Sequence, residues 1–302
     1  MYKKFHIHPG LALLLAACIS GTAFAGATFD KVRASGHLRL GYLPKAAPLT
    51  SAGANGVVEG YGAALCGELV TNVKSALNLP QLTVDWVPVT MDNRFTLVMR
   101  GDIDVLCTPT VPTVERRKAL AYSIPTFASG IRAVVRANAP TTLKDVLEAN
   151  PSQRNVWRGS PAMTLIEKTS FATLAGTTAE RALATKVSSL KLNTTTVSVP
   201  DVASGLQFLQ QGKIDVFLVE RDLALANMDD AARKNLVILK RQFTNEPLSL
   251  GLPRGDDDFR LFVDTVLSNL YSAPDFPALY SRYFQQYDDN SRQFFSWNIL
   301  PP

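Results

Sequence analysis

Short apolar segments alternate with amphipathic segments along almost the whole chain, and this alternation constrains the fold more than any other feature. His37–Leu43, Leu82–Val89 and Ile103–Cys107 are predicted strands. Between the first two, Gly60–Leu77 carries leucine and valine side chains four residues apart, as one face of a helix does. A second series begins near residue 132. Because strand–helix alternation is typical of α/β proteins, we expect two α/β units, each with its own sheet.

Capping residues predict where the shorter helices begin and end. Asp92 is expected to begin a helix that Gly101 ends, and Thr113 to begin another that runs through Leu120. The second series is predicted from the same kinds of signal. Its expected elements are strands at Arg132–Arg136, Asn155–Trp157, Thr195–Val199, Ile214–Val219, Leu236–Leu239 and Leu248–Leu252, and helices at Thr142–Ala149, from Ala162, from Asp201 through Gln211, at Phe259–Leu270 and at Phe276–Tyr283.

The first 25 residues are typical of an export signal. Lys3 and Lys4 precede the uncharged apolar run Leu11–Ile19, and Ala23–Ala25 then offers the small residues that a signal peptidase recognises. The run is too short for a membrane span, so we expect cleavage after Ala25 and a periplasmic protein. An alternative is that Leu15–Cys18 is a lipoprotein site, which would leave a lipid on that cysteine.

Composition without these 25 residues excludes several classes of protein. Two basic side chains leave with the signal, so 29 Lys and Arg remain against 26 Asp and Glu, an excess of three. Nucleic acid is therefore not expected as a partner. His37 is the one remaining histidine, which argues against a hydrolytic triad or a metal site. Cys66 and Cys107 remain as a pair, and in an exported chain they form either a disulfide or two buried thiols.

Three motifs near the middle of the first unit are the most informative part of the chain. GDIDVLC at residues 101–107, TVER at 113–116 and YSIP at 122–125 follow one another in that order. The series resembles the family 3 solute-binding proteins of amino-acid ABC transporters, whose pattern is a G-x-x-D strand, a T-x-x-R helix start and an F-S-x-P run. Within that family, Cys107 and the VER sequence are most similar to the glutamate/aspartate-binding branch.

Further motifs extend the resemblance over essentially the whole mature chain. Leu38–Tyr42 matches the first strand of the family and Gly56–Tyr61 its N-G-x-x-x-G-Y turn. Trp157–Ser160 stands where the family has S-G-T at the start of the second lobe. Gly212–Asp215 repeats the G-x-x-D strand, and Pro253–Gly255 matches the P-K-G sequence after the second hinge.

The resemblance implies a type II periplasmic binding fold, with two α/β lobes, a two-segment hinge and a ligand cleft between the lobes. The expected first lobe is residues 26–125 and 249–302, the second is 131–243, and the hinge segments are 126–130 and 244–248. It implies a monomer that captures an amino acid or related small carboxylate, delivers it to an ABC permease, needs no cofactor and is not an enzyme.

The resemblance also implies which residues hold the ligand. Arg116 would hold a carboxylate, since a guanidinium offers two parallel hydrogen bonds, although a surface ion pair with Glu115 is an alternative. Glu220 stands where the family has an Asp for the ammonium group, and a solvated glutamate is its alternative. Trp157 would either flank the anion site or pack in the core. The predicted ligand-binding residues are Leu43, Met91, Val111, Thr113, Arg116, Arg158, Gly159, Ser160 and Glu220.

Several of these positions depart from the glutamate/aspartate branch. Leu43, Met91, Pro109 and Val111 are apolar or bulky where that branch is polar or small. A second carboxylate on the ligand would lose water there without gaining a partner, so we expect a smaller or more apolar carboxylate. Two alternative functions stay open: a cyclohexadienyl-dehydratase-like enzyme that uses Glu220 as an acid, and a binder without transport, such as a sensor or a quinoprotein-dehydrogenase accessory.

Overall fold

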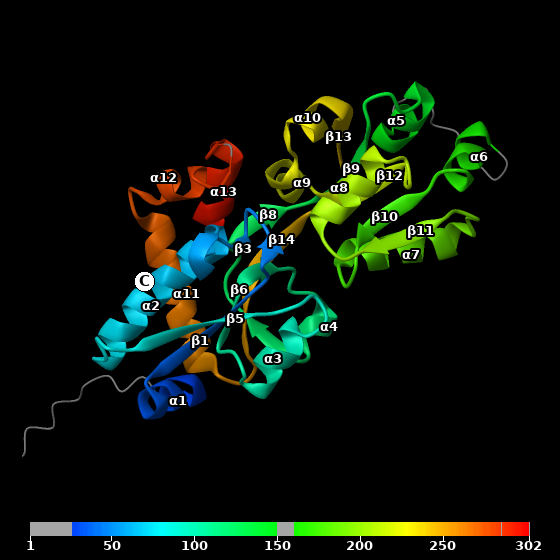
Figure 1. The fold of residues 1–302 in the computed structure, drawn as a ribbon. Coiled ribbons are helices and arrows are strands. Elements are labelled where there is room, and N and C mark those ends of the chain that lie inside the picture. Colours follow the sequence, from blue (N-terminus) through cyan, green and yellow to red (C-terminus); the bar gives the residue numbers. More distant parts are fainter. Residues whose placement is uncertain (1–25, 150–159, 285, 302) are drawn as a thin grey trace, which may run out of the picture.

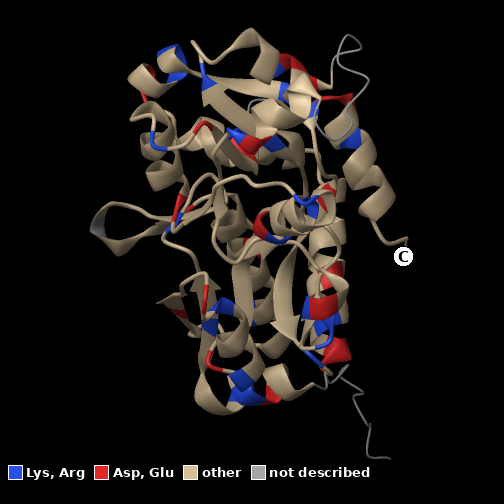
Figure 2. Cartoon of the chain, turned by 90° about the vertical axis from the view of Figure 1, so that its right-hand side faces the viewer, with Lys and Arg blue, Asp and Glu red and all other residues tan. Residues whose placement is uncertain are grey.

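The chain folds into two α/β lobes that are joined by extended strands (Figure 1). The computed structural model describes residues 26–149, 160–284 and 286–301. Lysine and arginine are interspersed with aspartate and glutamate over both lobes (Figure 2). None of the helices within the described residues combines the length and apolar composition that a membrane span needs.

The first lobe is built on a sheet with the strand order β5-β1-β6-β14-β7. Its strands are β1 His37–Tyr42, β5 Thr83–Pro88, β6 Val105–Thr110, β7 Leu120–Tyr122 and β14 Glu246–Pro253. Strand β1 is parallel to β5 and β6, whereas β14 is antiparallel to β6 and β7. The accompanying helices are α1 Ala27–Ser35, α2 Tyr61–Leu77, α3 Arg94–Arg100, α4 Val114–Arg117, α11 Asp257–Ser272, α12 Phe276–Ser281 and α13 Asp289–Asn298.

The second lobe has its own sheet, in the order β11-β10-β12-β9-β13. Strands β11, β10 and β12 are parallel, and β9 is antiparallel to both β12 and β13. The strands are β9 Ile131–Arg136, β10 Phe171–Leu174, β11 Thr196–Val199, β12 Val216–Glu220 and β13 Leu236–Gln242. The helices are α5 Thr141–Glu148, α6 Pro161–Glu167, α7 Thr178–Leu190, α8 Val202–Gln210, α9 Arg221–Asn227 and α10 Asp230–Asn235.

Two antiparallel strands cross between the lobes. Strand β8, Phe127–Ser129, pairs with the start of β14, so that Phe127 lies opposite Leu248 and Ser129 opposite Glu246. Gly130 follows β8, and a Cβ atom at this position would collide with the side chain of Gln242. The chain at Gly130 therefore passes the end of β13 as closely as a glycine allows. A separate small sheet is formed by β2 Lys45–Ala46, β3 Thr50–Ala52 and β4 Val58–Glu59, with the short helix η1 Ala54–Gly56 between β3 and β4.

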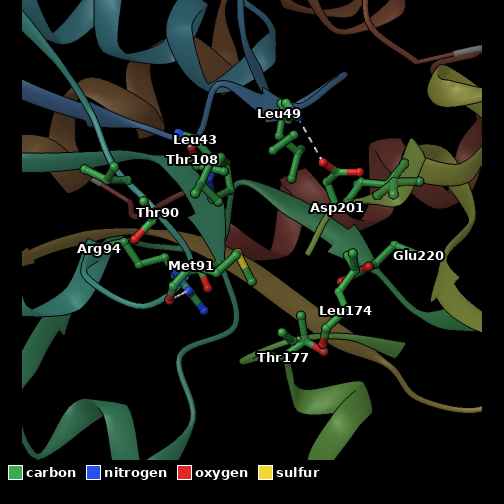
Figure 3. Close-up of a pocket in the computed structure, with 18 of the residues that line it drawn as sticks. Leu43, Leu49, Thr90, Met91, Arg94, Thr108, Leu174, Thr177, Asp201 and Glu220 are labelled. Atoms are coloured by element: carbon green, nitrogen blue, oxygen red, sulfur yellow. Dashed lines mark hydrogen bonds and ion pairs between the residues drawn. The ribbon is translucent and has the colours of Figure 1, made fainter. Parts of the chain in front are cut away.

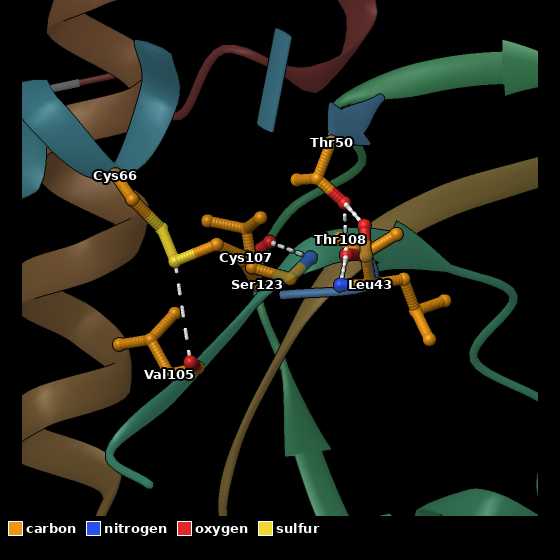
Figure 4. The surroundings of a disulfide bond; sticks show 8 residues. Leu43, Thr50, Cys66, Val105, Cys107, Thr108 and Ser123 are labelled. Carbon is orange, nitrogen blue, oxygen red and sulfur yellow. Dashed lines mark hydrogen bonds between the residues drawn. A yellow bond between two sulfur atoms is a disulfide. The ribbon is translucent and has the colours of Figure 1, made fainter. Parts of the chain in front are cut away.

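The disulfide alternative for the cysteine pair is confirmed. Cys66 and Cys107 are bonded and fully buried, and their Cα atoms are 6.1 Å apart, within the usual range for disulfides. The bond joins α2 to β6 (Figure 4). Leu65, Leu69 and Val73 on the same helix are buried, as the four-residue spacing predicts. The helix is therefore attached to the sheet by apolar contact and by one covalent bond.

Local signals placed some boundaries wrongly. The first short helix is preceded by Asn93 and not by Asp92, and the predicted helix from Thr113 ends at Arg117. Leu120–Tyr122 is a strand instead, because it pairs with β14 more than 120 residues further along the chain. The sequence patterns also missed α1, β10, α7, α9, α10 and α13. The predicted strand at 155–157 and the export signal lie outside the described residues.

Candidate functional site

A cavity of about 430 Å³ lies between the two lobes (Figure 3). Its walls come from the segments that follow β1, β5 and β6 in the first sheet and β10, β11 and β12 in the second. In parallel sheets, ligands bind beyond the carboxyl ends of the strands, where loops can vary without disturbing the sheet. Six such strand ends meet here. The topology of both lobes therefore places this cavity where ligands usually bind.

Two guanidinium groups line the first-lobe wall. Arg116 donates from Nη1 to the carbonyl oxygen of Val111 at 2.8 Å, and Arg94 is 3% exposed. The ring of Phe95 lies under both, with its centroid 4.3 Å from the Cζ of Arg94 and 4.8 Å from that of Arg116. An aromatic face attracts cations, so this one ring helps to hold both side chains in place.

Both cations stay protonated at neutral pH. Burial and, to a smaller extent, the positive charge of Arg116 lower the pKa of Arg94 to about 10. Burial is also the main cause that lowers the pKa of Arg116. A positive charge that has lost water is stabilised by a bound anion, so the pair favours a carboxylate in the cavity.

The second-lobe wall supplies acidic and hydroxyl groups. Glu220 stands at the end of β12, and burial raises the pKa of its carboxyl group. Asp201 begins α8 and accepts a hydrogen bond from the backbone N–H of Ser204 at 2.8 Å. Thr177 and Thr178 complete the polar part of this wall. The cavity therefore has the guanidinium groups of Arg94 and Arg116 on one side and the carboxyl groups of Glu220 and Asp201 on the other.

The two lobes are in contact around the cavity. The carbonyl oxygen of Gly176 accepts hydrogen bonds from Arg94 at 3.1 Å and from Arg116 at 3.2 Å, so one backbone group of the second lobe meets both first-lobe cations. Lys45 forms an ion pair with Asp201 at 3.1 Å. The first-lobe cations thus hold the second lobe in this arrangement.

The predicted site residues divide into three groups. Lining the cavity are Leu43, Met91, Val111, Arg116 and Glu220, together with Pro109. Thr113 and Ser160 are not among the lining residues. Their hydroxyl groups instead accept from the backbone N–H groups of Arg116 and Met163 and begin helices α4 and α6. Arg158 and Gly159 lie outside the described residues, as does Trp157, so the second-lobe anion site stays a prediction.

Arg94 is the main site residue that the sequence analysis missed. It stands in the first turn of α3, where the apolar spacing of Phe95 and Val98 dominated the interpretation. One signal was present, because Arg94 follows the carboxyl end of the parallel strand β5 by only six residues. Lys45 and Asp201 also line the cavity and were not predicted as site residues.

Comparisons with known proteins show which sequences this chain resembles. The family model of the bacterial extracellular solute-binding proteins, family 3, matches residues 38–286. The L-glutamate/L-aspartate-binding protein of Pseudomonas aeruginosa is 27% identical over 278 residues, which are 91% of this chain and 85% of the relative. The glutamate/aspartate import solute-binding protein of Escherichia coli is 26% identical over 286 residues, covering 92% and 88% of the two chains.

Solved structures have the same fold. A mutant of ArgBP from T. maritima is similar with a TM-score of 0.66 and 21% identity, over 86% of this chain and 100% of the other. The ancestral amino acid-binding protein AncCDT-1, a precursor of cyclohexadienyl dehydratase, also has a TM-score of 0.66 and 21% identity, over 85% and 100%. The predicted fold of two α/β lobes is thereby confirmed.

Proposed function

Because the chain belongs to the bacterial extracellular solute-binding proteins of family 3, we propose that it captures a free amino acid and delivers it to an ABC transporter. The relatives that bind glutamate and aspartate support this proposal. The observation that carries it is the charge arrangement of the cavity, with guanidinium groups on the first-lobe wall and Glu220 on the second-lobe wall.

A free amino acid is a zwitterion, so its site needs a fixed cation and a fixed anion. Arg116 would hold the α-carboxylate through two parallel hydrogen bonds. Glu220 would accept from the ammonium group, and the arriving positive charge would favour the ionised form of a carboxyl group whose pKa burial has raised. Each charge of the ligand would contact a different lobe, so binding would draw the lobes together.

Arg94 changes the expectation about the ligand side chain. The apolar residues Leu43, Met91 and Val111 do line the cavity, as the sequence analysis predicts for an apolar or small ligand. Arg94 nevertheless lines the same cavity and could partner a second carboxylate. L-glutamate and L-aspartate are therefore the first ligands to test, ahead of neutral amino acids.

The lobe limits and the export route belong to the same proposal. Residues 126–130 and 244–248, which contain the paired parts of β8 and β14, would act as the hinge between residues 26–125 with 249–302 and residues 131–243. The mature chain would begin after Ala25 and work as a monomer outside the cytoplasmic membrane, and a lipid on Cys18 is the alternative.

Catalysis is the second candidate. A buried carboxyl group with a raised pKa can act as a general acid, so Glu220 supports an enzymatic function as the alternative. AncCDT-1, which has the same fold, is described as a precursor of a dehydratase. Among the described residues, His, Cys, Asp and Glu form no group of three that could hold a metal ion. We propose binding without turnover, since the relatives named above are binding proteins.

Titration calorimetry with L-glutamate, L-aspartate and L-glutamine tests the proposal. Arg116→Ala should weaken binding of all three by more than about 100-fold, because it removes two hydrogen bonds to a charged group, which contribute roughly 1.5–3 kcal/mol each. Arg94→Ala should weaken the two dicarboxylic ligands much more than L-glutamine, which loses only the contact between Arg94 and Gly176 that helps to hold the lobes together. The neighbouring Arg117 is exposed and does not line the cavity, so Arg117→Ala is the matched control.

Two results would contradict the proposal. Retained affinity in Arg116→Ala would show that the ligand does not use this cation. Conversion of the bound amino acid, followed by NMR of the ligand during incubation, would show an enzyme instead of a binder.

A further inference from the structure

Helix α1 is docked on the first lobe through buried aromatic side chains. Phe29 on α1 is fully buried and meets the rings of Phe259 and Phe262 on α11 edge to face, with centroids 5.3 and 5.2 Å apart. The beginning of α1 therefore lies against the beginning of α11 (Figure 1). This apolar contact fixes where the chain stands at Gly26, the residue that precedes α1.

One buried carboxylate serves the beginnings of both helices. Asp256 is 6% exposed. Its Oδ1 accepts from the backbone N–H of Phe259 at 3.1 Å, and its Oδ2 accepts from that of Thr28 at 2.7 Å. Both donors are first-turn N–H groups, which have no partner inside their own helix. The carboxylate therefore caps α11 and also α1, whose own preceding residue, Gly26, has no side chain that could do so.

This buried carboxylate has no cationic partner. Asp256 forms no ion pair with any side chain in the described part of the chain. The cations on the two helices are engaged elsewhere, since Lys31 of α1 pairs with Asp104 and Arg260 of α11 with Asp257. A charge that has left water is costly unless a partner of opposite sign compensates for the loss. The surroundings of Asp256 therefore favour a positive charge that these side chains do not supply.

Gly26 brings the backbone to this carboxylate. A Cβ atom at position 26 would stand 2.6 Å from the Oδ1 of Asp256 and 3.5 Å from the Cβ of Asp258, so only a glycine fits. The φ of 150° at Gly26 is also one that other residues rarely adopt. A backbone nitrogen lies about 2.5 Å from the Cβ of its own residue, so the nitrogen of Gly26 is within about 5 Å of the Asp256 carboxylate.

The expected signal cleavage falls on this nitrogen. Hydrolysis of the bond between Ala25 and Gly26 consumes one water and leaves a carboxylate on Ala25 and an α-ammonium group on Gly26. We propose that this new ammonium group pairs with the carboxylate of Asp256, so that processing completes the attachment of α1 to α11. The proposal rests on the export route proposed above and does not depend on which amino acid the cavity binds.

The helix dipole makes the carboxylates around Gly26 necessary. An ammonium group at the beginning of a helix opposes the dipole of that helix, which favours negative charge there. Asp256 is buried beside Gly26, Asp258 is exposed next to it, and Asp30 stands in the first turn of α1. A chain that is uncleaved, or that begins at Cys18, would carry only a neutral amide at Gly26. Cleavage after Ala25 should therefore stabilise the first lobe.

Thermal melting of two forms of the mature chain tests the pair. One form begins with the free amine of Gly26, and in the other this amine is acetylated, which removes its charge. Acetylation should lower the melting temperature by about 2–4 °C at about pH 6.5. The stabilisation by the free amine is complete below about pH 8, where an α-amine is ordinarily protonated, and is lost as the pH rises.

At about pH 10.5 the two forms should therefore melt together. Carboxylates and guanidinium groups keep their charge over this range. Lys31 begins to lose its charge near the upper limit, but it does so equally in both forms. An effect of acetylation that is absent at about pH 6.5, or equal at both pH values, would overturn the pair.

Variants show whether Asp256 is the partner. Asp256→Asn should reduce the effect of acetylation to less than about 1 °C. Asp257→Asn is the matched control, because Asp257 is exposed and pairs with Arg260, and it should leave the effect unchanged. A full effect of acetylation in Asp256→Asn would overturn the proposal. The comparison of the two pH values decides the question even where Asp256→Asn does not fold.

The intact mass of the exported protein separates the pair from the export route. We expect a chain that begins at Gly26 with a free amine. Any other first residue would overturn the proposal together with cleavage after Ala25. A chain that does begin at Gly26 but gains no stability from its amine would overturn the pair alone, and the export route and amino-acid binding would stand.

Discussion

The two lobes share a strand order but differ in how they are held together. Each sheet places three parallel strands in the order second, first, third along the chain, followed by the strand that enters from the crossing, β14 in one lobe and β9 in the other. Only the first-lobe sheet is attached to its helix by a disulfide, and the same lobe supplies the cations of the cavity. The shared topology thus decides where the cavity lies, and the loops of each lobe decide its charge.

The repeated G-x-x-D motif has a structural role in both lobes. Asp104 accepts from the backbone N–H of Arg39 at 2.8 Å and pairs with Lys31. In the other lobe, Asp215 accepts from the backbone N–H of Ser170 at 3.0 Å and pairs with Arg136 at 2.8 Å. Each carboxylate therefore joins the start of the third strand to the start of the first. The motif that suggested a family of binders is a structural connection at the ends of the strands opposite the cavity.

Loss of the disulfide should produce the largest difference between the lobes. Replacing both Cys66 and Cys107 by Ala should lower the free energy of unfolding of the first lobe by about 4 kcal/mol, because the bond closes a loop with a sequence separation of 41. Urea denaturation, monitored by amide hydrogen exchange in each lobe, would measure this loss of stability. Amides of β10 and β12 should keep their protection, and equal loss in both lobes would refute the difference in how the lobes are held together.

The two G-x-x-D carboxylates should differ in their contribution to stability. The side chain of Asp104 is 1% exposed and that of Asp215 is 34% exposed. Asp104→Ala should destabilise the protein by about 3 kcal/mol, because it leaves buried donors without an acceptor. Asp215→Ala should cost about 1 kcal/mol, since water can replace part of what is lost. Chemical denaturation would compare them, with the exposed Asp30→Ala as control; equal costs would contradict the burial argument.

The smallest expected effect is a pH dependence of the stability of the second lobe. Burial opposes ionisation of Asp215, but hydrogen bonds from Ser170 and Arg136 outweigh it and hold the pKa below its ordinary value. The folded pKa lies below the unfolded one, so the stabilisation is complete above about pH 4 and is lost as the pH falls through the folded value.

The matched measurement uses Asp215→Asn. Its stability difference from wild type should be below about 1 kcal/mol at neutral pH, because the group is partly solvated, and should shrink as the pH falls below about 4. Urea midpoints between about pH 6 and about pH 3 would show this. A difference that stays constant over this range would mean that the carboxylate charge does not contribute.

The sequence predicted best those elements whose signals are local. Helix α2 and strand β1 begin and end within one residue of their predicted limits, because apolar spacing and flanking glycines mark them. Leu120, the first residue of β7, was assigned to a helix, since the pairing of β7 with β14 comes from the far end of the chain. Helix α13 was missed because its apolar face becomes clear only where Phe295 packs against Tyr271 and Phe276.

The candidate site shows the same difference between residues marked by a local motif and residues brought together only by the fold. Arg116 was found because T-x-x-R is a short motif whose threonine accepts from the backbone of the arginine itself. Arg94 was missed, because only the close approach of α3 and α4 brings its guanidinium over the same ring as that of Arg116. A pair of cations formed from separate helices has no signal in either helix alone.

The sequence by itself determined the two α/β units and the candidate disulfide pair, because strand–helix alternation and the presence of two cysteines in an exported chain are read from residue type and order alone. Only the tertiary structure decided which charges meet in the cavity between the lobes and that Gly26 lies against Asp256. Those features depend on sheet order and helix packing, which bring together segments more than 100 residues apart, such as Arg94 with Glu220 and Gly26 with Asp256.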